Sequence, residues 1–148
     1  MDEAKNTRRS VVRLSYDGRV FKTFKGHLAR ERYENEKRVL LFLEQQGCSF
    51  VPRLVSSHDD DMMLVMTNCG QKVHHMNDRK KQSLFQELES FGVRHEDAEL
   101  RNITYRQNDG RFCIIDFEFA TILDDPTHKS PPMMPHRPEH PSEPSGGE

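Results

Sequence analysis

Alternating apolar and polar residues near the start of the chain predict a β-hairpin. The runs 11–16 and 19–24 are rich in β-branched and aromatic residues, which favour strands. They flank an Asp-Gly pair at 17–18, which suits a type I′ turn because glycine, and tolerably aspartate, can adopt a positive φ. In that register Leu14 lies opposite Phe21.

The next segment predicts an amphipathic helix over 28–46 that ends near Gly47. Its apolar stripe, with a carboxylate in the middle, is Ala29, Tyr33, Glu36, Leu40 and Leu43. A buried unpaired carboxylate is costly, so Glu36 should have a cationic partner. Lys22, which shares a strand face with Val20 and Phe24, is the nearest candidate in sequence. Two other interpretations stay open: Lys22 as an edge lysine, and Glu36 reaching the helix rim.

The rest of the pattern predicts two strands, a second helix and a second hairpin. These segments are strands 51–55 and 62–66, a helix over 78–91, and a hairpin that pairs 103–106 with 112–115. Asp78 is the expected N-cap of the second helix. The succession predicts an α+β fold, with a small antiparallel sheet and one long helix followed by a reduced helical part with a β-hairpin.

The two ends of the chain differ in composition from its centre. Residues 1–9 are polar and are expected to be frayed. Seven of the eight prolines lie in 124–148, where apolar residues are rare, and this composition predicts a disordered tail. One stretch, 132–137, fits P-x-x-P-x-R, a pattern that SH3 domains bind. We therefore expect a domain over 10–123 and a tail that could recruit a protein partner.

Composition excludes several functional classes. A formal net charge of −2 argues against a nucleic-acid partner. No apolar run approaches the roughly 20 residues of a membrane span, and the first residues have no apolar signal-peptide core. Three widely spaced cysteines fit reduced thiols better than a disulfide framework. A cytoplasmic or nuclear location is the expectation.

Three oxygen-bearing side chains stand out in the second half of the chain. Asp97 and Asn102 belong to H-x-D-x-x-x-x-N, and Asp116 ends an apolar strand in I-D-F-E. Asn102 and Asp116 fall at the two open ends of the predicted hairpin, so we expect them close together. Carboxylate and amide oxygens suit a hard cation such as Mg²⁺ together with phosphate oxygens.

These two motifs, in this order, resemble the catalytic and metal-binding loops of the protein-kinase-like superfamily. The resemblance implies a truncated kinase-like fold that uses ATP and Mg²⁺. In it, Lys22 and Glu36 would form the ion pair that holds the α- and β-phosphates, and Asp97 would be the catalytic base. Asn102 and Asp116 would hold Mg²⁺.

The resemblance also assigns further contacts. I-D-F-E is closer to the aminoglycoside and choline kinases than to typical protein kinases, and Glu118 would then assist the metal; the alternative is a carboxylate facing solvent. Residues 67–70 would form the hinge between lobes, where Asn68 and Cys69 contact adenine, and Val20 would also contact the nucleotide. For 67–70 a simple turn is the alternative.

The sequence departs from the kinase pattern in three places. The region before the long helix has only Gly18 and Gly26, so the glycine-rich loop and its first strand are expected to be absent. Glu96 stands where many protein kinases have an arginine that binds the phosphorylated activation loop. No helix is predicted beyond Ala120, so most of the C-terminal lobe is missing, as in a shortened relative of the RIO group or the KEOPS kinase subunit.

Two functions of different class follow from these observations. The first is an ATP- and Mg²⁺-dependent phosphotransferase with an unknown acceptor. The second is a pseudokinase-like interaction module whose proline-rich tail binds a partner. The acceptor stays open because the region that would select it is the region that the chain lacks.

Overall fold

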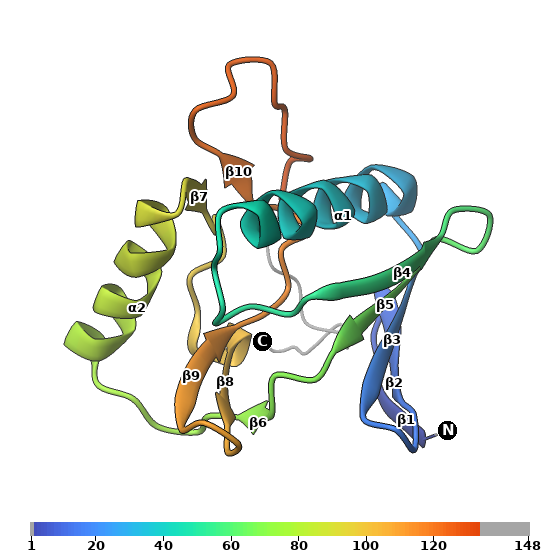
Figure 1. Cartoon of the computed structure of the whole chain (residues 1–148). Helices are drawn as coiled ribbons and strands as arrows, with labels where there is room; N and C mark the ends of the chain where they lie inside the picture. Colours follow the sequence, from blue (N-terminus) through green and yellow to red (C-terminus); the bar gives the residue numbers. More distant parts are fainter. Residues whose placement is uncertain (1, 134–148) are drawn as a thin grey trace, which may run out of the picture.

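A computed structural model describes residues 2–133, which form an α+β fold (Figure 1). A five-stranded antiparallel sheet and a three-stranded sheet lie apart in this view, with the long helix α1 above them. Within the described residues, neither helix is long and apolar enough to cross a bilayer.

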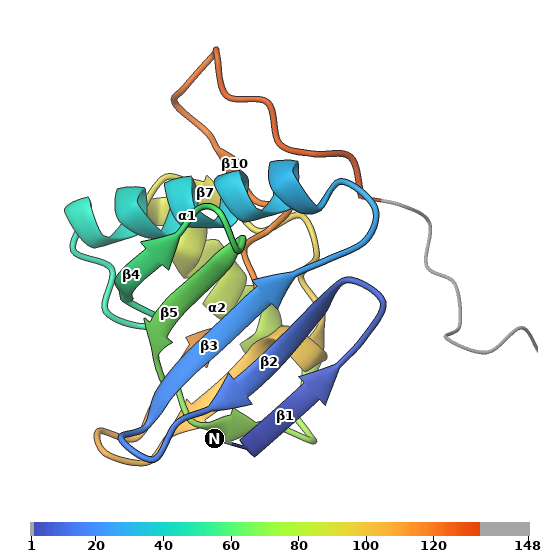
Figure 2. The ribbon, with the colours of Figure 1, turned by 90° about the vertical axis from the view of Figure 1, so that its right-hand side faces the viewer.

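The larger sheet contains one strand that the sequence did not predict. Its strands are β1 (Asp2–Asn6), β2 (Ser10–Leu14), β3 (Arg19–Phe24), β4 (Leu54–His58) and β5 (Met63–Thr67), in the order β1-β2-β3-β5-β4. The expectation that residues 1–9 are frayed, and that the first strand is absent, is therefore wrong. β1 is a polar edge strand that pairs only with β2 (Figure 2), and an edge strand needs little apolar sequence.

The first hairpin has a register one residue away from the prediction. Leu14 pairs with Val20 rather than with Phe21. Of the two predicted turn residues, Gly18 alone has a positive φ, 82°, whereas a type I′ turn requires two such residues. The Ser15 N–H donates to the Arg19 carbonyl at 2.9 Å, so three residues form the loop instead of two.

Helix α1 (Ala29–Gln45) confirms the predicted stripe, since all five stripe residues are buried. β4 begins later than predicted because the chain before it turns into the core. There the Phe50 carbonyl accepts the Ile114 N–H at 2.9 Å, which ties the loop after α1 to the second half of the molecule.

The second half combines one helix with short strands. Its elements are β6 (Gln71–Lys72), α2 (Asp78–Ser90), β7 (Val93–Arg94), a 3-10 turn (Leu100–Asn102), β8 (Ile103–Arg106), β9 (Arg111–Ile114) and β10 (Thr121–Ile122). The three-stranded sheet has the order β6-β8-β9, and β7 pairs with β10. The N-cap of α2 is Asn77 instead of Asp78, because the Asn77 side chain accepts the Lys80 N–H at 2.8 Å.

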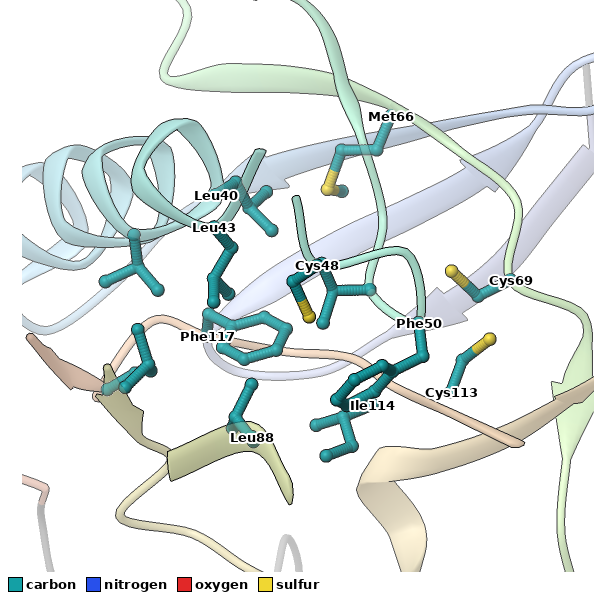
Figure 3. Packing of buried hydrophobic residues seen from close by; sticks show 14 of the residues in the cluster. Leu40, Leu43, Cys48, Phe50, Met66, Cys69, Leu88, Cys113, Ile114 and Phe117 are labelled. Carbon is teal, nitrogen blue, oxygen red and sulfur yellow. The ribbon is translucent and has the colours of Figure 1, made fainter. Parts of the chain in front are cut away.

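One hydrophobic core joins both halves (Figure 3). Leu40 and Leu43 of α1 meet Phe117 and Leu88 of the second half, and Phe50 lies beside Ile114. The three cysteines are buried free thiols in this core, as the sequence predicted. The relative placement of the two sheets is therefore set by shared packing.

The first part of the predicted tail packs on the domain. His128 is buried, its Nε2 donates to the Asn35 Oδ1, and its Nδ1 accepts the Ile122 N–H at 2.8 Å. Asp125 forms an ion pair with Arg38 at 2.7 Å. The sequence predicted disorder here because proline-rich composition does not reveal such specific polar contacts. The remainder, 134–148, with four of the seven prolines of the predicted tail and most of the P-x-x-P-x-R motif, lies outside the described residues.

Candidate functional site

A cleft of about 650 Å³ lies between the two larger sheets. Its apolar lining comes mainly from strands β2, β3 and β5 of the larger sheet, which carry Val12, Leu14, Val20 and Met66, and Ile115 just after β9 adds to it from the other wall. Its polar lining includes Lys22, Glu36, Asn102 and Asp116. An apolar cleft of this size with a few converging polar groups is the usual form of a small-molecule site.

Lys22 is the centre of the polar part. Its Nζ lies 2.7 Å from Glu36 Oε1, 3.0 Å from Glu118 Oε2 and 3.2 Å from Asp116 Oδ1. The predicted pair of Lys22 with Glu36 is therefore present, and both side chains are almost fully buried. The two other interpretations, an edge lysine and a carboxylate at the helix rim, are wrong.

The conformation of the I-D-F-E segment brings its two carboxylates to Lys22. Asp116 has a φ of 68°, a left-handed conformation that is uncommon for a residue other than glycine. The next residue, Phe117, is buried and donates its N–H to Glu36 Oε2 at 2.9 Å. Glu36 therefore fixes both the lysine and the turn, which aims the Asp116 side chain into the cleft.

Glu118 lies in the interior, so the solvent-facing alternative for it is wrong. Its Oε1 accepts from Arg32 at 2.9 Å, and its backbone carbonyl accepts the Asn35 amide at 3.0 Å. Sequence analysis missed Arg32 and Asn35, although both lie on the buried face of α1. The position of Arg32, one helical turn before Glu36, was the available signal.

Burial and neighbouring charges strongly shift the pKa values of the side chains in this cluster. Burial would lower the pKa of Lys22, but Asp116, Glu118 and Glu36 outweigh it and hold that pKa well above its usual range. Burial would raise the pKa of Asp116, but the Lys22 ammonium holds it well below its usual range. Burial, opposed by Lys22 and reinforced by Asp116, raises the pKa of Glu118 to about 7.

Asp97 lies in the loop before β8, beside the cleft residue Asn102, but is not itself among the residues that line the cleft. The Asn102 amide donates to the Asp97 carbonyl at 2.8 Å and to its Oδ2 at 3.2 Å. Both carboxylate oxygens of Asp97 also accept from Arg101, at 2.7 and 2.8 Å. Asp97 is thus held next to Asn102 by hydrogen bonds, and Arg101 neutralises its charge.

His95 connects the Asp97 loop to the Asp116 turn. It is buried, with Nε2 2.9 Å from the Ile115 carbonyl and Nδ1 3.2 Å from the Asp97 nitrogen. A neutral ring with its proton on Nε2 satisfies both bonds. Phe117 packs against its ring, with centroids 5.1 Å apart. His95 therefore holds the backbone of both loops, a role that its place in the motif alone did not predict.

Three carboxylates form the group best placed to hold a cation among the described residues. Oxygens of Glu36, Asp116 and Glu118 lie within 4.8 Å of one another. The predicted set was Asn102, Asp116 and Glu118; two of these, Asp116 and Glu118, belong to this cluster, where Glu36 joins them. Asn102 still lines the cleft with Asp116. Carboxylate oxygens suit Mg²⁺, although Lys22 already occupies the centre of this cluster.

The predicted hinge also lines the cleft, at Asn68 and Cys69. The Cys69 carbonyl accepts from the Thr104 hydroxyl at 2.7 Å, and the Asn68 side chain accepts the Gly70 N–H at 2.8 Å. These bonds hold the connection between the two sheets in one conformation. Val20, the remaining predicted contact, faces the same cleft from β3.

The chain matches no family model and no curated protein sequence. The geometry of the cleft and of its charged cluster therefore carries the functional argument.

Proposed function

We propose that this protein is an ATP- and Mg²⁺-dependent phosphotransferase with a truncated protein-kinase-like architecture. The observation that carries the proposal is the ion pair between Lys22 of β3 and Glu36 of α1, with Asp116 at 3.2 Å from the same ammonium. Protein kinases use a strand lysine, a helix glutamate and a metal-binding aspartate in these positions.

The chain's own residues supply positions for each part of the nucleotide. The apolar side chains around Val20 and the backbone of Asn68 and Cys69 would hold the base. Lys22, still paired with Glu36, would neutralise phosphate oxygens after exchanging its contact with Asp116 for them. Asp116, Asn102 and Glu118 would hold Mg²⁺, which supplies charge neutralisation in phosphoryl transfer.

Asp97 would accept the proton of the acceptor hydroxyl. Its carboxylate must first leave Arg101, which contacts both of its oxygens. An acceptor that binds Arg101 would release the base and position the hydroxyl in the same step. The acceptor itself could be a protein or a small molecule.

The test measures phosphate release from ATP in the presence of Mg²⁺. We expect Asp97→Ala and Asp116→Ala to lower the rate about a hundredfold or more, because each removes a proton acceptor or a metal ligand. Asp60→Ala, an exposed residue in the turn between β4 and β5, is the matched control and should leave the rate unchanged. Equal rates in all four proteins would contradict the proposal.

The same Arg101 contact favours a second candidate, a pseudokinase-like interaction module. A base that stays neutralised by Arg101 would leave a cleft that binds nucleotide without turnover. This candidate is supported if Mg²⁺-ATP raises the melting temperature while the wild type releases no phosphate and an Arg101→Ala variant does. Recruitment of a partner by 124–148 would then be its remaining activity.

A further inference from the structure

Two lysines face each other at the border of the cleft, one from each wall. Lys5 belongs to β1, where it pairs with the cleft residue Val12, and Lys72 belongs to β6. Both line the cleft. Their side chains are close enough to interact, and burial together with the Lys5 charge lowers the pKa of Lys72. Neither forms an ion pair with a carboxylate among residues 5–133.

Such an arrangement is unfavourable until an anion lies between the ammonium groups. Like charges at short range repel, and an anion placed between them turns that repulsion into two attractions. Other lysines of this protein, such as Lys22 and Lys37, have carboxylate partners. Lys5 and Lys72 differ from these two because no carboxylate of residues 5–133 forms an ion pair with them and because both line the cleft.

The position of this pair in the cleft indicates which kind of anion it would bind. Lys72 comes two residues after Gly70, where the chain crosses between the sheets, and the charge of Asp116 also acts on it. The pair therefore belongs to a cleft whose apolar side chains suit a nucleobase and whose Lys22 suits phosphate oxygens. We propose that Lys5 and Lys72 together bind the phosphate chain of the nucleotide, in the place where a glycine-rich loop would otherwise cover it.

This inference rests on the proposed function and adds to it a residue pair that links the two walls. Charge-assisted contacts from β1 and β6 would hold phosphate groups from opposite sides. They would thereby compensate for the backbone N–H groups that a glycine-rich turn supplies. The turn between β1 and β2, Thr7-Arg8-Arg9, contains no glycine.

The experiment measures the affinity of the full chain for adenosine, AMP, ADP and ATP by titration calorimetry with Mg²⁺. The Lys5→Gln/Lys72→Gln variant should bind ATP about a hundredfold more weakly, or about tenfold for each charge-assisted contact. Its affinity for adenosine should stay the same. The Lys81→Gln/Lys129→Gln variant removes the same charge outside the cleft and should match the wild type. The difference in ATP affinity between the wild type and the Lys5→Gln/Lys72→Gln variant should also become smaller with added salt.

The outcomes separate this inference from the proposed function. Unchanged ATP affinity in the Lys5→Gln/Lys72→Gln variant, or an equal loss for adenosine, would overturn the inference while nucleotide binding stands. If the wild type binds neither adenosine nor ATP, the proposed function fails, and inorganic tripolyphosphate becomes the probe. Binding of tripolyphosphate that this variant loses would still support the lysine pair, and no binding would overturn it.

Discussion

At the scale of single residues, Lys22 determines the electrostatics of the site. Its ammonium contacts three carboxylates, and Arg32 is the second cation in contact with them. The cluster therefore contains one acidic group more than it has basic groups. Burial makes each of these charges expensive unless its partners stay in place.

Replacement of Lys22 by methionine tests this balance. We expect the free energy of unfolding to fall by about 3–5 kcal/mol, since the change leaves buried carboxylates without their main cation. Urea denaturation measures the loss. Lys25→Met, at an exposed position just after β3, should cost less than about 0.5 kcal/mol. Mg²⁺ should restore part of the stability of Lys22→Met, because the metal can replace the ammonium. A loss as small as that of the control would contradict this account.

The sequence revealed part of this cluster. A carboxylate inside the apolar stripe of a helix requires a cation, and this requirement correctly paired Glu36 with Lys22. The position of Arg32, one helical turn before Glu36, was a weaker signal, because an arginine in a charged helix is normally exposed. The left-handed φ of Asp116 could not be predicted, since it depends on bonds that His95 and Glu36 make from distant parts of the chain.

At the scale of elements, the segment after β10 is attached to α1 by a buried histidine. His128 is 9% exposed and has a hydrogen-bond partner on each nitrogen only when its ring is neutral. The charged groups that act on it are Arg38 of α1 and Asp125 of its own segment. Burial is the main cause that lowers its pKa below 6.5, and Arg38 contributes in the same direction.

This attachment should weaken in acid. Between the lowered pKa of the folded state and 6.5, the unfolded chain binds more protons than the folded chain. The contribution of His128 to the free energy of unfolding should therefore fall as pH drops through 6.5, by at most about 1.4 kcal/mol per pH unit. The raised pKa of Glu118 acts in the opposite direction over this range, so the measurement compares urea denaturation of the wild type and of His128→Gln from pH 8 to pH 5. The difference in stability between the two proteins should change through this range, and a constant difference would exclude a contribution from His128.

Elements with clear periodicity were predictable, and those defined by their partners were not. Helix α1 has a regular apolar stripe, which determined its position. β1 has none, and pairing with β2 decides its conformation. The register of the first hairpin depended on how Ser15 and Arg19 close the loop. A dipeptide pattern does not contain that information.

At the scale of the whole molecule, Gly70 lets the connection between the two sheets pass close to the backbone of β8. It has a φ of 96°, and a Cβ atom at this position would lie 1.9 Å from the Tyr105 carbonyl oxygen. Gly18 has a similar φ of 82°, with no atom within 4 Å of such a Cβ. The two glycines thus share backbone strain and differ in the space around them.

The pair provides a matched test of this contact. We expect Gly18→Ala to cost about 1–2 kcal/mol from the left-handed conformation alone. Gly70→Ala should cost clearly more, since the β8 backbone must also move. Thermal denaturation compares the two variants. Equal costs would show that the β8 backbone can move away from this position without penalty.

The complete arrangement could be predicted only in outline. Alternating segments indicated an α+β fold, and motif spacing brought Asn102 and Asp116 to one region. The contribution of Glu36 to the carboxylate cluster, and the position of Arg101 on Asp97, depend on how two sheets and a helix pack. Local sequence does not specify that packing.

The continuous core has a consequence for how this molecule responds to binding. Phe24 of β3 and Leu88 of α2 belong to a single buried cluster, so neither wall of the cleft can loosen by itself. Any compound that tightens one wall must therefore slow hydrogen exchange in the opposite wall as well. Binding in the cleft would then stabilise the whole domain cooperatively, rather than one of its two halves alone.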